Sequence, residues 1–108
     1  MSYADLQTFI TDTSGLPRAT TLFREPGLRT LLLHLKPGEE MAEHQTPGAI
    51  TVHCLKGQVI ISYRDEKVTL GPASLVGLGP AIPHSVAAEE DTLLLVTICE
   101  QSRDKQSA

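Results

Sequence analysis

The stretch that decides the fold runs from Glu43 to Gly57, EHQTPGAITVHCLKG, and it is matched by a second stretch, PAIPHSV, from Pro80 to Val86. Each stretch places one histidine, His44 or His84, beside a proline-containing turn and next to a run of residues that favour strands. The sequence therefore predicts a sheet structure in which two turns carry these imidazoles to one pocket.

Working outward, short strands separated by turn signals account for most of the chain. In LRTLLLHLK, residues 28–36, Leu31, Leu33 and Leu35 share one face, and the following Pro-Gly pair ends the strand. Further strands are expected at 50–55, 59–63, 68–70, 75–78, 82–86 and 92–98. Short strands at this spacing predict an all-β, antiparallel sandwich or barrel.

The segments outside the barrel are predicted to be a short arm and a polar tail. We expect one domain, with an N-terminal arm and edge strand at 1–27, the barrel at 28–99 and a polar tail at 100–108. Leu6, Phe9 and Ile10 have helical spacing, which predicts a short helix in the arm. The acidic run from Glu39 to Glu43 is typical of a solvated edge beside a turn.

Composition excludes several classes of protein. Of the 108 residues, 41% are hydrophobic and 20% are charged, and the net charge of -4 is opposite in sign to that of a nucleic-acid binder. The longest apolar runs are far shorter than the roughly 20 residues of a membrane helix. The acidic, polar N-terminus is not typical of a secretory signal, so we expect a cytoplasmic protein with no nucleic-acid or membrane partner.

Two further expectations concern cysteines and assembly. Cys54 and Cys99 are expected to be buried thiols rather than a disulfide, since a secreted framework normally has more cysteines. Runs such as 31–33, 59–61 and 93–96 are apolar on both faces of their strands. A second apolar partner is therefore expected, and a homodimer is the simplest way to supply it.

The two histidine stretches together resemble the small single-domain cupins, which are RmlC-like jelly-roll barrels with two motifs facing one pocket. The first cupin motif has the pattern G-x5-H-x-H-x3–4-E-x6-G, and here Gly38, His44, Thr46, Ile50 and Gly57 occupy its frame. The second motif ends in a proline, a small residue and a histidine, as Pro80 to His84 do. The resemblance covers roughly residues 28–98 and implies an antiparallel jelly roll.

The first motif departs from the family pattern at two metal ligands. The resemblance implies a site for one divalent metal (Fe, Mn, Ni or Zn), but Thr46 stands at the second histidine and Ile50 at the glutamate. Only His44 and His84 carry over, and two imidazoles alone make a weak site. His53 is a possible third ligand, although strand alternation from Ile50 points its side chain outward.

Three functions remain open from the sequence. In the first, the barrel is a metal-free or weakly metallated module that binds a small organic ligand. In the second, it is a metal-dependent oxygenase or isomerase with His44 and His84 as ligands. In the third, either histidine is a general base without metal. The residues expected to line the ligand pocket are His44, Thr46, Ile50, Val52, Cys54, Leu78, Ile82 and His84.

Overall fold

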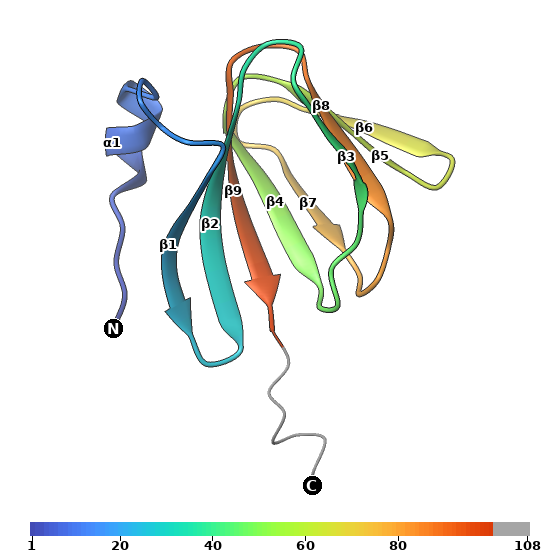
Figure 1. Cartoon of the computed structure of the whole chain (residues 1–108), viewed down its shortest axis with the longest axis horizontal. Coiled ribbons are helices and arrows are strands. Elements are labelled where there is room, and N and C mark those ends of the chain that lie inside the picture. The colour runs from blue at the N-terminus through green and yellow to red at the C-terminus, as the bar shows by residue number, and fades with distance from the viewer. Residues whose placement is uncertain (101–108) are drawn as a thin grey trace, which may run out of the picture.

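The computed structural model describes residues 1–100 and consists of two antiparallel sheets that face each other, preceded by one short helix (Figure 1). The predicted tail lies outside the described residues except for Glu100. In chain order the elements are α1 (Leu6–Thr11), β1 (Ala19–Glu25), β2 (Leu28–Leu35), β3 (Glu40–His44), β4 (Ile50–Lys56), β5 (Val59–Tyr63), β6 (Glu66–Leu70), β7 (Leu75–Leu78), β8 (His84–Ala88) and β9 (Thr92–Cys99).

The strand order is that of a jelly roll. One sheet has the order β1-β2-β9-β4-β7 and the other β3-β8-β5-β6, and each pair of neighbours is antiparallel. The all-β jelly roll with a short N-terminal helix, predicted from the sequence, is confirmed. Residues 40–44 form strand β3 at the edge of the smaller sheet, which the sequence did not predict, although most of them are exposed as expected for a solvated edge.

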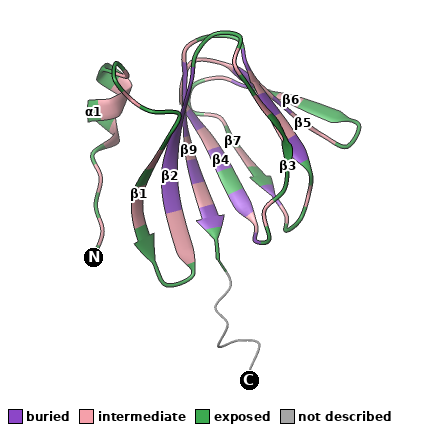
Figure 2. Ribbon diagram, in the orientation of Figure 1, coloured by how far each residue is buried: buried purple, intermediate pink, exposed green. Residues whose placement is uncertain are grey.

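The core lies between the two sheets. Alternation along β2 directs Leu31, Leu33 and Leu35 inward, and buried residues from β4, β5, β8 and β9 meet them there. Figure 2 shows the buried positions concentrated on β2, β4 and β9, at the centre of the larger sheet. Strands β2, β9 and β4 are each hydrogen-bonded to a neighbouring strand on both sides. The backbone at the ends of these strands is therefore held firmly in place.

The N-terminal arm covers part of the outer face of the five-stranded sheet. Leu32 and Leu93 are directed away from the core, yet they are only 1% and 0% exposed. The arm is attached beside them: the Lys56 ammonium group donates to the Ile10 carbonyl oxygen at 3.4 Å, and Thr13 Oγ1 donates to Asp91 at 3.0 Å. The arm therefore supplies some of the apolar cover for which the sequence suggested a second copy of the chain.

His34 is part of the same attachment. This β2 histidine is buried on the outer face, with Nε2 2.8 Å from Asp91 Oδ1 and Nδ1 3.4 Å from the Leu16 carbonyl oxygen. Burial tends to raise the pKa of Asp91, but the hydrogen bonds from His34 and Thr13 and the nearby positive charges reverse that tendency. The pKa of Asp91 consequently lies below its ordinary value.

The cysteine prediction holds for one residue only. Cys54 is fully buried in the core, whereas Cys99, the last residue of β9, is exposed, so the expectation that both thiols are buried is wrong for Cys99. Neither forms a disulfide within the chain. Within residues 1–100, no helix is long and apolar enough to cross a bilayer.

Candidate functional site

His44 and His84 lie together at one end of the two facing sheets. His44 ends β3, His84 begins β8, and the two residues are direct partners in the antiparallel ladder. Their ring centroids are 4.3 Å apart, with 60° between the ring planes. We call this end, where β3, β7 and β9 finish and β2, β4 and β8 begin, the histidine end; it is the lower end in Figure 1.

The two rings differ in exposure but share one hydrogen-bond pattern. His44 is exposed, while His84 beneath it is 4% exposed. In each ring Nδ1 lies 2.9 Å from the backbone carbonyl oxygen two residues earlier, that of Ala42 or Ile82. A carbonyl oxygen can only accept, so each Nδ1 carries the proton, and in the neutral ring Nε2 is left as an acceptor. The site thus presents two fixed imidazole acceptors, one of them solvent-accessible.

The loop between β3 and β4 holds this end of the barrel in place. The Thr46 carbonyl oxygen accepts from the Ala81 amide at 2.8 Å, which ties the two histidine-bearing turns together. Thr46 Oγ1 donates to the Gly48 carbonyl oxygen at 2.9 Å. A Cβ atom on Gly48 would lie 1.7 Å from the carbonyl oxygen of Cys99, so the loop approaches the end of β9 more closely than any side chain permits.

The predicted apolar lining residues lie in or beside the core. Ile50 and Leu78 are buried partners across β4 and β7 at the histidine end, whereas Val52 and Cys54 lie progressively farther along β4. Ile82 is half-buried in the turn before β8. Burial raises the pKa of the Cys54 thiol, which makes it a poor candidate for a thiolate ligand.

The residues present do not make a full metal site. His53 pairs with Leu75 on the face opposite the core residues Val52 and Cys54, as strand alternation predicted, and is therefore not brought to the histidine pair. Within residues 1–100, no three His, Cys, Asp or Glu side chains are grouped so that they could hold a metal ion. The metal that the cupin pattern implies thus has two imidazoles available here, fewer than a tight site needs.

Comparison with known proteins places this arrangement in a family. The family model described as a cupin domain matches residues 31–99, which include both histidine stretches. The chain belongs to the cupin family. No curated protein that was compared matches this cupin.

Solved structures give the same fold. A cupin superfamily protein from Desulfitobacterium hafniense is 19% identical with a TM-score of 0.73, covering 77% of this chain and 76% of its own. A conserved protein of unknown function from Streptococcus pyogenes is 24% identical with a TM-score of 0.72, covering 78% and 74%. KdgF from Halomonas sp. is 18% identical with a TM-score of 0.71, covering 81% of each chain. At these identities the likeness concerns the fold alone.

This cupin has a cavity at the histidine end that was not predicted from the sequence. It has a volume of about 360 Å³ and is lined by Arg29, Thr46, Pro47, Gly48, Ile98, Cys99 and Glu100. Thr46 is the predicted site residue that takes part. The sequence could have placed Arg29 on the inner face, because it lies two residues before the inward-facing Leu31 on the same strand.

Proposed function

We propose that this cupin binds a small organic molecule at the histidine end of its barrel, without a tightly bound metal. The observation that carries the proposal is the pairing of His44 and His84, in which both Nδ1 atoms are occupied by backbone carbonyl oxygens. Two neighbouring Nε2 acceptors match a ligand that has hydroxyl or N–H donors. Fixed acceptors of this kind orient a ligand with little loss of side-chain freedom on binding.

The surroundings support an organic ligand. Ile50 and Leu78 make the core apolar at the same end of the barrel, and Thr46 lines a neighbouring cavity of a size suited to small molecules. Ligand sites generally combine apolar walls with a few fixed polar groups, and this end of the barrel has both.

A metal-dependent oxygenase or isomerase is the alternative. It is favoured by the same two Nε2 acceptors, since a metal-binding histidine commonly donates its other ring nitrogen to a carbonyl oxygen. His44 and His84 would hold the ion. Thr46 and Ile50 at the other two family ligand positions argue against it, and we assign no reaction step to a metal.

Native mass spectrometry of tag-free protein tests the proposal, because it weighs organic adducts that survive purification. We expect wild-type protein to carry or take up a small organic adduct that His44→Ala and His84→Ala lose. His53→Ala is the matched control, because its ring lies on the outer face, and it should keep the adduct. Equal retention by all three variants would contradict a role for the histidine pair.

We further propose that the protein is a cytoplasmic homodimer. The free thiols of Cys54 and Cys99 are in keeping with a reducing compartment. Leu75 on the edge strand β7 is 64% exposed and lies beside the half-buried His53, so one large apolar side chain of the outer face is exposed. A second copy packed there would shield this surface from water.

A further inference from the structure

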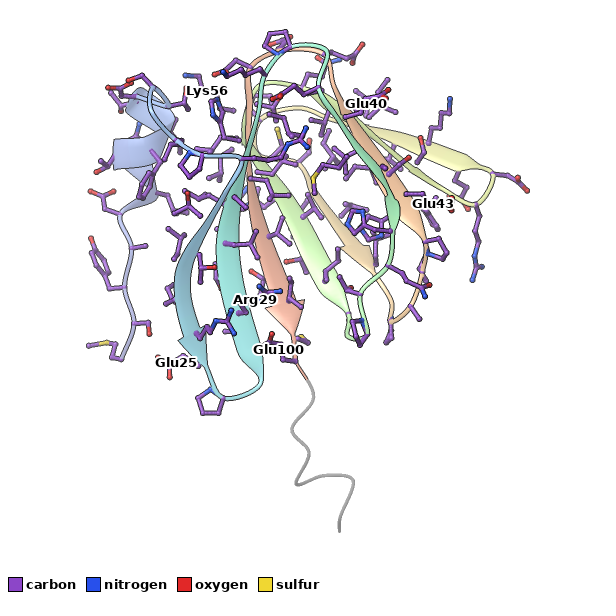
Figure 3. All side chains as sticks on the ribbon, viewed as in Figure 1. Glu25, Arg29, Glu40, Glu43, Lys56 and Glu100 are labelled. Carbon is purple, nitrogen blue, oxygen red and sulfur yellow. The ribbon has the colours of Figure 1, made fainter. Side chains whose placement is uncertain are left out.

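Arg29 places a cation on the inner face of the barrel at the histidine end. It lies directly opposite Ile98 in the β2–β9 ladder, and directly opposed residues share a face of the sheet. Ile98 belongs to the core, so Arg29 extends the inner face of the larger sheet at its lower end. Figure 3 shows Arg29 and Glu100 close together there, at the ends of β2 and β9.

The guanidinium group of Arg29 is incompletely satisfied. Its Nε atom is buried and has no hydrogen-bond partner within residues 1–100. A carboxylate oxygen of Glu100 lies 3.4 Å from that atom, which is longer than a good charge-assisted hydrogen bond. A buried donor without a partner costs free energy, so a better-placed acceptor would be bound there.

A second arginine adds to the positive charge. Arg24 on β1 is the direct cross-strand partner of Arg29. Like charges in directly opposed positions repel each other, and an anion between or beside them relieves that repulsion. Glu100 provides one partly exposed carboxylate near this pair, with 42% of its side chain exposed.

The cavity of about 360 Å³ adjoins this charged position. Its lining combines Arg29 with the apolar residues Ile98 and Pro47, and it reaches Thr46 in the loop that follows His44. A guanidinium group binds a carboxylate through two parallel hydrogen bonds, and the volume suits a small organic acid. The Glu100 carboxylate beside Arg29 indicates that this position accepts that chemical group.

We propose that Arg29 is the anchor for the carboxylate of a small organic acid, and that the ligand displaces Glu100 from the guanidinium group. This inference rests on the proposed function and names the chemical class of its ligand. The acid group lies at Arg29, and the remainder of the molecule extends past Thr46 toward the histidine pair.

The test is an NMR titration of ¹⁵N-labelled full-length protein with phenylacetate and, separately, with its uncharged analogue phenylacetamide. We expect phenylacetate to bind at millimolar concentrations and to shift the amide signals of Thr46, Gly48 and Cys99. Phenylacetamide should bind at least about tenfold more weakly, because a hydrogen bond to a charged group is lost. Equal binding of the two probes, or no binding of phenylacetate, overturns the inference.

Variants separate the roles of the two charged residues. Arg29→Gln should weaken phenylacetate binding about tenfold or more, and Glu100→Gln should strengthen it severalfold, because the internal competitor is gone. Arg64→Gln, an arginine in the exposed β5–β6 turn, should bind as wild type does. If Arg29→Gln does not fold, Arg29→Lys should give an intermediate affinity, since an ammonium group lacks the planar fork. If the Arg29 variant binds phenylacetate as wild type does, Arg29 does not bind the carboxylate. If Glu100→Gln binds phenylacetate as wild type does, the ligand does not displace Glu100.

The proposed function and this inference can fail separately. If the native adduct depends on the histidines but Arg29→Gln retains it, the function stands and the carboxylate subsite is overturned. If phenylacetate binding and the adduct depend on Arg29 while His44→Ala and His84→Ala retain both, the subsite stands and the role of the histidine pair is overturned.

Discussion

The imidazole rings of His44 and His84 lie edge to face, 4.3 Å between centroids, and each is fixed by a 2.9 Å contact from Nδ1 to a backbone carbonyl oxygen. This pair joins the two turns that close the histidine end of the barrel. Its two remaining acceptors serve either an organic ligand or the start of a metal site. The residues around the pair decide between these uses.

Restoring the family ligands should convert the pair into a metal site. We expect Thr46→His with Ile50→Glu to bind Ni²⁺ about a hundredfold or more tighter than wild type by calorimetry, because four protein ligands then converge. Thr46→His with Thr51→Glu is the control, since Thr51 is the exposed neighbour of buried Ile50. A folded double variant with no gain in nickel affinity would contradict the alignment of the first motif.

Gly48 should be intolerant of a side chain. The close approach to the Cys99 carbonyl oxygen means that Gly48→Ala forces the loop away from β9, at a cost of about 3 kcal/mol in the free energy of unfolding. Gly71→Ala is the matched control, because a Cβ atom added at Gly71 would meet nothing within 4 Å and should change stability little. Urea unfolding measures both. Equal stability of the two variants would be inconsistent with the described loop.

Asp91 should make stability depend on pH in the acid range. Its pKa in the folded protein is below the ordinary 3.8, so its contribution is present above that pH and is lost as the pH falls through the lowered value. The stability advantage of wild type over Asp91→Asn should therefore shrink between about pH 5 and pH 2 in urea unfolding. Asp65→Asn, in the exposed β5–β6 turn, is the control. An advantage that stays constant over this range would contradict the attachment described for the arm.

The outer face around Leu75 should govern assembly. Leu75→Glu should convert a wild-type dimer to monomer in sedimentation experiments, because a charge would be placed in the apolar contact. Thr69→Glu, an exposed position on β6 in the other sheet, should leave the mass unchanged. If the wild-type protein sediments as a monomer, the proposed homodimer is wrong.

Local patterns in the sequence were sufficient for the fold class and the core face. The alternation of Leu31, Leu33 and Leu35 identified the core face, and the frame of the two motifs around His44 and His84 identified the family. Strand β3 was missed because its acidic residues face solvent and its pairing with β8 is a long-range contact.

The surroundings of the site could not be predicted from local sequence patterns, because they depend on contacts between residues far apart in the chain. His34 is hydrogen-bonded to Asp91, 57 residues away, and the arm is attached through Lys56 and Asp91, contacts that no periodicity reveals. The cavity at Arg29 forms only where β2, β9 and the loop around Gly48 meet.

Elemental analysis of protein purified without an affinity tag or chelator tests the central claim most directly, with His44→Ala analysed beside wild type. If the histidine pair serves an organic ligand, both proteins should contain far less than one metal ion per chain. A nearly stoichiometric metal in wild type that disappears in His44→Ala would contradict the account and favour the metal-dependent enzyme.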